Sequence, residues 1–350
     1  MQTPVLETKP KTDWETLAEE VLAGKKLTKE EALSILQAPD TEVLALLQGA
    51  YRIRSHYYGN KVKLNMIINA KSGLCPEDCG YCSQSIVSNA PIEKYPQLSK
   101  DVLVDGAAKA KESKAGTYCI VMSGRRPTDK EVDNVAEAVR EIKEQHNMKI
   151  CACLGLITPN QAAKLKEAGV DRFNHNINTS ASNHTNITST HTYDDRIDTL
   201  NNVKEAGMSP CSGVILGMGE SDEEIVEMAY ALYEIDADSI PVNFLNAIPG
   251  TPLESMKKLG AIKCLKALAL FRYINPTKEI RISGGREVNL RHLQPMGLYA
   301  ANSIFVGDYL TTDGQRTQWD HEMIEDLGFE IEDCAFDSEP PSINADISTV

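Results

Sequence analysis

The sequence predicts an α/β protein built as a (β/α)8 barrel of the TIM type, with an N-terminal helical extension and an acidic C-terminal tail. From residue 62 onward, short runs of β-branched and aromatic residues alternate with amphipathic helical stretches. Alternation of this kind indicates repeated βαβ units and a parallel sheet. Eight such units over about 250 residues are typical of the barrel. An open, doubly wound sheet is the alternative that fits the same alternation.

Composition excludes several other classes of protein. The chain has 350 residues, of which 42% are hydrophobic and 25% charged, as in a globular protein. It has no run of about 18 apolar residues that could span a membrane, and its N-terminus lacks the apolar segment of a secretory signal. A net charge of −14 argues against nucleic-acid binding. We therefore expect a cytoplasmic protein that acts on neither membranes nor nucleic acids.

Residues 1–60 are expected to form the helical extension. Asp13 is placed to cap a first helix, and Thr28 with Glu31 has the spacing of a capping box at the start of a second. A third helix is expected from Asp40 through the stretch VLALLQGAYRIRSHYY. The segment contains few turn residues and no strand-like alternation, so it should pack on the main domain as a helical lead-in.

The barrel is expected to span residues 61–318. Its strand candidates are residues 62–68, 117–122, 149–155, 171–177, 211–217, 239–245, 279–283 and 303–307. Two of the helical stretches between them end in Ala-Gly, at Gly169 and Gly207, where a left-handed C-cap is expected. In such a barrel the chemistry lies at the C-terminal ends of the strands and in the loops that follow them.

Residues 319–350 are expected to form an acidic C-terminal helix and tail. No Lys or Arg follows Arg316, whereas five Asp and five Glu do. A charge run of this kind is typical of a solvated extension rather than of a binding site.

The strongest chemical signal is the loop CPEDCGYC, which follows the first strand candidate. Cys75, Cys79 and Cys82 form a C-x3-C-x2-C array there. Nine cysteines in a chain without an export signal indicate metal or redox chemistry rather than disulfides. Three thiolates so close together favour an iron–sulfur cluster with one open metal position. Zinc, which usually takes a fourth protein ligand in structural sites, and unligated thiols are the alternatives.

This array resembles that of the radical S-adenosylmethionine enzymes. The resemblance implies that the three cysteines hold a 4Fe–4S cluster, whose open iron is chelated by the amino and carboxylate groups of S-adenosylmethionine. Tyr81 matches the aromatic position before the last cysteine of the motif. The stretch GVILGMGE resembles the adenine-contacting strand of the family at Gly213, Ile215 and Glu220. By itself, such a glycine pattern is typical of a tight turn from a strand to a helix.

Other cysteines narrow the resemblance to the biotin synthase family. Cys119, Cys151 and Cys211 lie in three strand candidates, and Arg281 lies in a fourth. In that family these four positions ligate a 2Fe–2S cluster inside the barrel, whose sulfide is the sulfur donor. The likeness covers about residues 50–330 and includes the stretches NHNINTS, TYDDRIDTL, IPGTPL, ISGGRE and ANSIF.

Two of these positions have ordinary alternatives. Arginine is normally protonated and is a poor metal ligand, so Arg281 alone would be expected to pair with a carboxylate or to stack. Residues i and i+2 of a strand face the same side, so periodicity allows either Cys151 or Cys153 as the ligand. The family's spacing to the following Leu-Gly favours Cys151 and leaves Cys153 as a core neighbour. Cys264 and Cys334 are assigned no chemistry.

Substrate contacts are expected from asparagines. The resemblance places Asn176 and Asn178 of NHNINTS near the S-adenosylmethionine ribose and the substrate's ureido ring, and it places Asn243 at another substrate position. Many family members carry aspartate where Asn178 stands, so a charged hydrogen bond becomes a weaker neutral one. Each asparagine could instead satisfy a turn or strand end. His175 is expected to be a packed or hydrogen-bonded histidine rather than a ligand.

The resemblance implies a sulfurtransferase that inserts sulfur into dethiobiotin, the last step of biotin synthesis. S-adenosylmethionine is cleaved to methionine and a 5′-deoxyadenosyl radical, with an electron from reduced flavodoxin or ferredoxin. The catalytic residues are then Cys75, Cys79, Cys82 and Arg281, and the enzyme is a homodimer. Two alternatives are another radical S-adenosylmethionine barrel, such as a hydrogenase-maturation or amino-acid mutase relative, and a zinc-binding or electron-transfer protein without radical chemistry.

Overall fold

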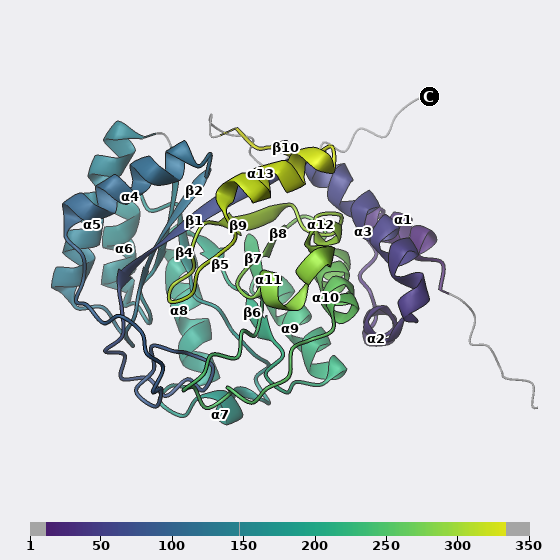
Figure 1. Cartoon of the computed structure of the whole chain (residues 1–350), viewed down its shortest axis with the longest axis horizontal. Helices are drawn as coiled ribbons and strands as arrows, with labels where there is room; N and C mark the ends of the chain where they lie inside the picture. Colours follow the sequence, from purple (N-terminus) through teal and green to yellow (C-terminus); the bar gives the residue numbers. More distant parts are fainter. Residues whose placement is uncertain (1–11, 147, 334–350) are drawn as a thin grey trace, which may run out of the picture.

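The computed structural model describes residues 12–146 and 148–333, which form a closed barrel of parallel strands surrounded by helices (Figure 1). Strand β1 (Lys61–Lys71) pairs with β2 (Thr117–Met122) on one side and with β9 (Ser303–Val306) on the other. The pairing of β1 with β9 closes the sheet. The predicted (β/α)8 barrel is therefore confirmed, and the open doubly wound sheet is wrong.

The other strands follow in chain order around the barrel. They are β3 (Lys149–Cys153), β4 (Arg172–Asn174), β5 (Ser209–Cys211), β6 (Val214–Leu216), β7 (Ser239–Phe244) and β8 (Glu279–Ile282). Strands β5 and β6 share one place in the barrel, since both pair with β7. The single strand predicted over 211–217 is thus broken at Ser212 and Gly213. A Cβ on Gly213 would lie 1.9 Å from the carbonyl oxygen of Pro241, so only glycine fits there.

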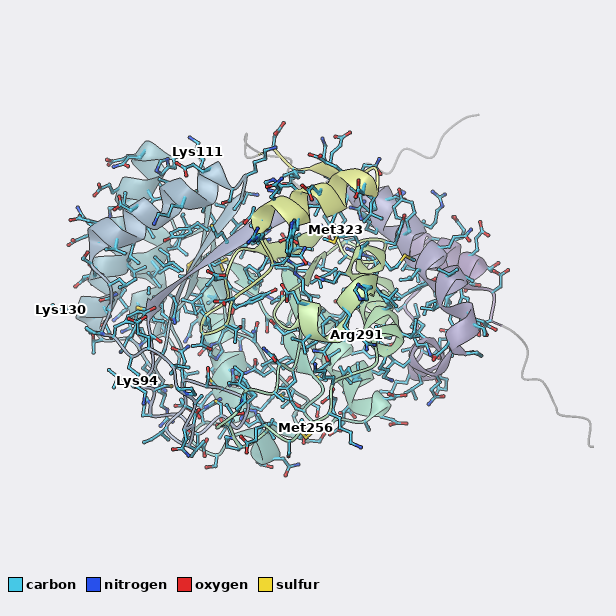
Figure 2. The ribbon with its side chains drawn as sticks, viewed as in Figure 1. Lys94, Lys111, Lys130, Met256, Arg291 and Met323 are labelled. Carbon is cyan, nitrogen blue, oxygen red and sulfur yellow. The ribbon has the colours of Figure 1, made fainter. Side chains whose placement is uncertain are left out.

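Helices cover the outside of the barrel. The long ones are α4 (Lys100–Glu112), α5 (Asp129–Gln145), α6 (Pro159–Glu167), α8 (Tyr193–Glu205), α9 (Asp222–Glu234) and α10 (Ala261–Ile274). Short helical turns are α7 (His184–Ile187), α11 (Arg286–Asn289), η2 (Arg291–Leu293) and α12 (Gln294–Gly297). Gly169 and Gly207 have φ of +100° and +76°, which confirms the predicted left-handed caps. Lys111 on α4 and Lys130 on α5 point outward (Figure 2).

The N-terminal helices pack against α10 on one side of the barrel (Figure 1). They are α1 (Trp14–Leu22), α2 (Lys29–Gln37) and α3 (Val43–Tyr58), with the 3-10 turn η1 (Asp40–Glu42) before α3. Asp13 caps α1, and the capping box of Thr28 and Glu31 begins α2, as predicted. The Tyr273 hydroxyl of α10 donates to the Trp14 carbonyl at 2.8 Å. Because it lies between these helices and the barrel, α10 is buried on nearly all sides.

The C-terminal part of the described chain returns to the barrel. Helix α13 (Thr317–Asp326) is tied to α11 by Arg286, whose Nη2 donates to both carboxylate oxygens of Asp320 at 2.7 and 2.8 Å. Strand β10 (Glu330–Ile331) then pairs with the first residues of β1. Residues 334–350 of the expected acidic tail, with Cys334, lie outside the described residues. Within the described residues, no helix combines the length and the apolar composition that crossing a membrane requires.

Candidate active site

A cavity of about 400 Å³ lies at the C-terminal end of the barrel, between the strand ends and the loop that follows β1. Both predicted groups of cysteines meet there. Cys75, Cys79 and Cys82 of the loop line it, as do Cys119 and Cys151 of β2 and β3. The two groups lie 37 or more residues apart in the sequence. The barrel therefore brings a loop site and an interior site to one enclosed space.

The cysteine loop, residues 72–92, is clasped by the residues that precede α8. The carboxylate of Asp78 accepts hydrogen bonds from Thr188 Oγ1 at 2.7 Å and from the Ser189 backbone N–H at 2.9 Å. Burial raises the pKa of Asp78, but hydrogen bonds from Ser189 and its neighbours outweigh burial and hold that pKa well below its usual range. The Gly80 N–H donates to the Ile187 carbonyl at 2.9 Å. These contacts fix the loop that carries the three thiols.

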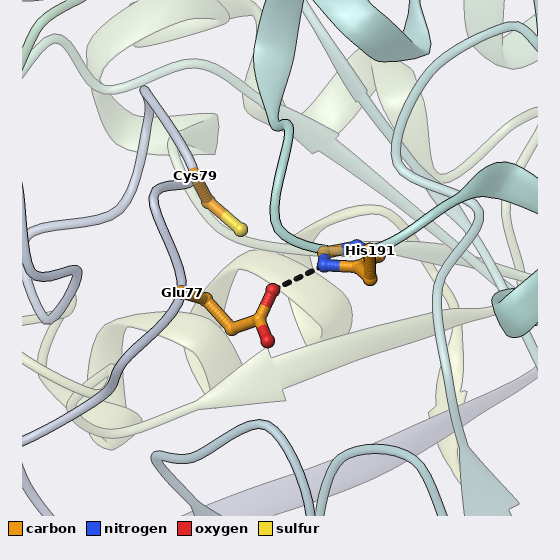
Figure 3. Close-up of side chains that lie close together, drawn as sticks. All are labelled: Glu77, Cys79 and His191. Atoms are coloured by element: carbon orange, nitrogen blue, oxygen red, sulfur yellow. Dashed lines mark hydrogen bonds and ion pairs between the residues drawn. The ribbon is translucent and has the colours of Figure 1, made fainter.

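Glu77 and His191 form a buried hydrogen-bonded pair beside Cys79 (Figure 3). The ligand atoms of Glu77, Cys79 and His191 all lie within 4.8 Å of one another. Burial, followed by the charge of Arg196, lowers the pKa of His191 and favours its neutral form. A mixed set of thiolate, imidazole and carboxylate can hold zinc. Cys79, however, belongs to the loop array and cannot serve both sites at once.

Cys119, Cys151 and Cys211, which we call the cysteine layer, lie in contact inside the barrel. Their exposed fractions are 4%, 3% and 0%, and Cys119 is the Cα partner of Cys151 across β2 and β3. Hydrogen bonding among the thiols and burial raise the pKa of Cys151 and of Cys211 well above the usual range. Buried thiols of this kind become good ligands when a metal displaces their protons. Cys153 lines the cavity two residues beyond Cys151, outside this layer, and burial raises its pKa to about 12.

Arg281 points into the barrel from β8 and lines the cavity beside the cysteine layer. Its Nη2 donates to Glu279 at 2.5 Å and to Ser239 at 2.8 Å. Its guanidinium carbon lies 4.9 Å from the centroid of the Phe305 ring. The pairing and stacking expected of an ordinary arginine are both present, and they occur next to the three thiols.

Tyr81, Asn178 and Arg196 form one wall of the cavity. The Tyr81 hydroxyl lies 2.6 Å from the Asn178 side-chain amide. In the orientation that satisfies both neighbours, the Asn178 oxygen also accepts from Arg196 Nη1 and Nη2 at 3.2 and 3.1 Å. Arg196 is buried and donates to the Asn176 carbonyl at 2.8 Å, without an ion pair to any described carboxylate. A buried guanidinium in this state suits an anionic ligand.

Asn176 and Asn243 line the cavity and also hold the break between β5 and β6. The Asn176 Oδ1 accepts from the Gly213 N–H at 3.0 Å. The Asn243 Nδ2 donates to the Val214 carbonyl at 2.9 Å. His175, next to Asn176 in the chain, is buried, and its ring Nε2 has no hydrogen-bond partner among the residues that the structure describes. The structural roles considered from sequence therefore coexist with a position on the cavity wall.

Of the predicted adenine-contacting residues, Ile215 lines the cavity. Gly213 packs under Pro241 at the strand break. The Glu220 carboxylate turns back to accept from the N–H groups of Gly217 at 2.6 Å and Met218 at 2.8 Å. Glu220 is not among the residues that line the cavity, and its carboxylate closes the turn after β6.

Sequence reasoning missed Arg196, Glu279 and the pair of Glu77 and His191. Arg196 lies on the buried face of α8 with Leu200, so a charged residue at a core-facing position was the available signal. Glu279 stands two residues before Arg281 in the same strand and shares its face. The pairing of Glu77 with His191 spans 114 residues, and no local pattern indicates it.

Two family models match this chain. One, described as the Radical SAM superfamily, matches residues 71–231, and the other, the Biotin and Thiamin Synthesis associated domain, matches residues 241–330. Biotin synthase of Geobacillus kaustophilus (strain HTA426) is 68% identical over 320 residues, covering 91% of this chain and 96% of the relative. Biotin synthase of Bacillus subtilis (strain 168) is 64% identical over 319 residues, covering 91% and 95%.

Two solved structures with the same fold have sequences distant from that of this chain. Methylornithine synthase superposes with a TM-score of 0.81 at 20% identity, over 91% of this chain and 98% of its own. The FeFe-hydrogenase maturase HydG from Carboxydothermus hydrogenoformans gives a TM-score of 0.76 at 18% identity, over 91% and 79%. At such identities the likeness establishes a shared barrel and no more.

Proposed function

Since the chain belongs to the biotin synthase family of radical S-adenosylmethionine enzymes, we propose that it inserts sulfur into dethiobiotin inside the cavity described above. The observation that carries the proposal is the meeting of two separate cysteine groups on one enclosed cavity. Family membership sets aside the zinc-binding and electron-transfer alternatives. It also sets aside a radical barrel of another specificity.

The thiols present fit two clusters. The loop offers three cysteines in one cavity wall, and the cysteine layer offers three touching thiols with an arginine beside them. We assign a 4Fe–4S cluster to Cys75, Cys79 and Cys82, and a 2Fe–2S cluster to Cys119, Cys151, Cys211 and Arg281. When bound, the clusters supply the electron that cleaves S-adenosylmethionine to methionine and a 5′-deoxyadenosyl radical, and the sulfur that is transferred.

The chain's own residues bind and orient the reactants. Arg196 offers its guanidinium to the carboxylate of S-adenosylmethionine, and Asn178 with Tyr81 holds that guanidinium in place. Asn243 of β7, across β6 from Asn178, also presents its side-chain amide at the cavity wall. The apolar side chains Ile215 and Phe305 help to exclude water around them. Positioning and exclusion of water are the contributions expected of a protein whose cofactors carry the reaction.

A one-electron carrier, flavodoxin or ferredoxin, is the proposed reductant, and the cysteine loop is the proposed place where it docks. Leu74, Ile86 and Val87 of this loop are 66%, 68% and 44% exposed. They are three of the seven large hydrophobic side chains exposed among the described residues. Arg125 and Arg126 lie on the neighbouring loop after β2 and are exposed, which suits an acidic partner. The enzyme is further proposed to be a cytoplasmic homodimer, as the family resemblance implies.

The proposal is tested with anaerobically reconstituted, reduced enzyme that is incubated with S-adenosylmethionine, with and without dethiobiotin. Both 5′-deoxyadenosine and biotin are measured by mass spectrometry. The Cys79→Ala variant should lose both products, whereas Cys119→Ala should lose biotin and retain cleavage. Cys264→Ala is the matched control, because Cys264 is a buried thiol in α10 outside both groups. If 5′-deoxyadenosine forms without biotin in the unaltered enzyme, the assigned substrate is wrong.

A further inference from the structure

The carboxylate of Glu279 lies at the N-terminal end of the barrel, below the cysteine layer, and three cations surround it. The Glu279 side chain is 3% exposed. Its Oε2 lies 2.6 Å from Arg172 Nη1 of β4 and 3.3 Å from Lys63 Nζ of β1. Its Oε1 lies 2.5 Å from Nη2 of Arg281, two residues further along β8. Cations from three strands therefore meet on one buried carboxylate.

Two hydroxyl groups link this carboxylate to the same guanidinium. Ser239 Oγ accepts from Arg281 Nη2 at 2.8 Å and donates to Glu279 Oε1 at 3.1 Å. Ser303 Oγ accepts from Arg281 Nε at 3.3 Å and donates to the same carboxylate oxygen at 3.1 Å. Strand register places both serines, since Ser239 is the Cα partner of Glu279 and Ser303 is that of Arg281. Two of the three guanidinium nitrogens are thus held on the Glu279 side.

The third nitrogen, Arg281 Nη1, makes no hydrogen bond to the described part of the chain. The guanidinium lies against the Phe305 ring and lines the cavity with Cys119 and Cys151. An arginine side chain has many rotamers, and hydrogen bonds to its planar fork select among them. Because Nε and Nη2 are held from one side, Nη1 is the nitrogen left to face the cysteine layer.

We propose that Glu279 is a positioning residue, whose carboxylate fixes the guanidinium of Arg281 so that Nη1 faces the cysteine layer. Arg172 and Lys63 hold the carboxylate in turn. The inference rests on the proposed function, because the orientation of Arg281 affects the reaction only through the second cluster. It goes beyond that function, since neither the motifs nor the family resemblance gives a role to Glu279, Arg172 or Lys63.

The net charge of the residues around Glu279 is consistent with a positioning role next to an anionic cluster. Lys63 lies 3.6 Å from a second carboxylate, that of Glu332, and Lys149 interacts electrostatically with both carboxylates, so two carboxylates face four cations. The remaining positive charge lies beneath the thiols, where a cluster bound by thiolates brings negative charge. Residues that orient a metal ligand through hydrogen bonds typically change metal affinity or activity by about 10–100-fold when they are removed.

A purely structural role is the competing explanation, because a buried carboxylate among cations also stabilises the fold. Glu279→Gln alone cannot separate the two, since it leaves Arg172 without its carboxylate partner and Lys63 with Glu332 alone. The double variant Glu279→Gln/Arg172→Met removes one carboxylate and one cation together. If Glu279 only balances charge, the double variant should regain both stability and the properties of the second cluster.

The experiment compares unaltered enzyme, Glu279→Gln and the double variant after anaerobic reconstitution. It records iron and sulfide per chain, the Mössbauer and visible spectra of each cluster, and the melting temperature. We expect the double variant to melt near the unaltered enzyme and to keep its 4Fe–4S signature, while the 2Fe–2S signature shifts and its retention against a chelator falls about tenfold. Adding Glu279→Gln to Arg281→Ala should then change the 2Fe–2S spectrum no further.

Asp320→Asn is the matched control, because it breaks the other buried carboxylate–arginine pair, with Arg286. It should lower the melting temperature and leave both cluster spectra unchanged. An unaltered 2Fe–2S spectrum and unaltered cluster retention in the folded double variant would overturn the inference.

If the double variant does not fold, Ser239→Ala/Ser303→Ala keeps every charge and should shift the 2Fe–2S spectrum in the same sense. An unchanged spectrum there also overturns it, whereas unaltered enzyme without any second cluster refutes the proposed function instead.

Discussion

Arg196 is the single side chain on which binding of S-adenosylmethionine is expected to depend most. It is 6% exposed, lines the cavity, and contacts only neutral oxygen atoms of Asn176 and Asn178 among the described hydrogen bonds. A desolvated guanidinium of this kind gains most from an anionic partner, and a planar fork matches a carboxylate. Its positive charge is not paired with a carboxylate of the described residues, so it is available to a ligand.

Replacing this residue by Arg196→Gln should weaken binding of S-adenosylmethionine by about 10–100-fold, the effect of losing one hydrogen bond to a charged group. The affinity of Arg196→Lys for S-adenosylmethionine should lie between those of Arg196→Gln and the unaltered enzyme, since lysine keeps the charge and loses the planar fork of donors. Equilibrium dialysis with the reconstituted enzyme measures the dissociation constant. Arg140→Gln, an exposed arginine of α5, is the control. Equal dissociation constants for the Arg196→Gln and Arg140→Gln variants would contradict this assignment.

His175 makes folding depend on pH. Burial, followed by the charges of Arg196 and His191, lowers its pKa well below the ordinary value of 6.5. The folded chain thus excludes a proton that the unfolded chain binds below pH 6.5, so the unfolding free energy should fall as the pH falls through that range. In His175→Gln the slope between about pH 5 and 6 should be smaller by up to about 1.4 kcal/mol per pH unit. Urea unfolding at several pH values measures this slope. Equal slopes for the unaltered protein and His175→Gln would show that His175 binds a proton as readily in the folded chain as in the unfolded chain.

At this scale, residues could be selected from the sequence where the chemistry is contiguous in the chain, and their roles stay predictions. The cysteines of the loop and the asparagines of NHNINTS could be selected because motif spacing identifies them, and all of them line the cavity. Glu279 and Arg196 could not be assigned roles, since their partners come from other strands and loops. Glu220 shows that a motif match does not predict every contact of a side chain. It occupies a motif position, and its carboxylate closes a turn.

At the scale of elements, the clasp between the cysteine loop and residues 187–191 is expected to control how well the loop holds iron. Asp78 accepts hydrogen bonds from the hydroxyl or backbone groups of three consecutive residues beginning at Thr188. An amide in its place accepts at one oxygen only and faces the other donors with its own N–H groups. The clasp should therefore loosen, and the three thiols should lose their common orientation.

Asp78→Asn is accordingly expected to lose iron to a chelator about tenfold faster than the unaltered enzyme, as is typical when residues that orient metal ligands are changed. Iron release is followed by the absorbance of the chelate under anaerobic conditions. Asp195→Asn is the control, because Asp195 accepts similar hydrogen bonds in the capping box of α8 and does not touch the loop. Equal rates in the two variants would show that the clasp does not affect cluster retention.

Element type was predictable because apolar periodicity differs between strands and helices. The capping residues Asp13 and Thr28 also marked helix starts correctly. The break between β5 and β6 was not predictable, since CSGVILG has the composition of one continuous strand. It results from a tertiary contact, the close approach of Gly213 to Pro241 of β7. Contacts of this kind are set by the closed barrel rather than by local sequence.

At the scale of the whole molecule, closure of the barrel explains why two cysteine groups can share one cavity. The loop after β1 lies over the C-terminal strand ends, whereas the cysteine layer lies deeper, inside the ring of strands. An open sheet would spread β2, β3, β5 and β8 along one face and leave Arg281 far from Cys119. The alternation of strands and helices is compatible with both arrangements, so only the pairing of β1 with β9 decides between them.

The same closure predicts what removal of iron does to the fold. One continuous hydrophobic core joins the strands, the outer helices and the N-terminal helices, and the cysteine layer is a separate small cluster inside it. The chain should therefore stay folded without its clusters, unlike small domains whose folding depends on a metal. Ligands that bind only the folded state still add stability, so anaerobic chelation should lower the melting temperature by about 5–10 °C while far-ultraviolet circular dichroism is retained. Loss of the circular dichroism signal or of cooperative melting in the iron-free chain would instead mean that the clusters complete the fold, and that the barrel core alone is insufficient.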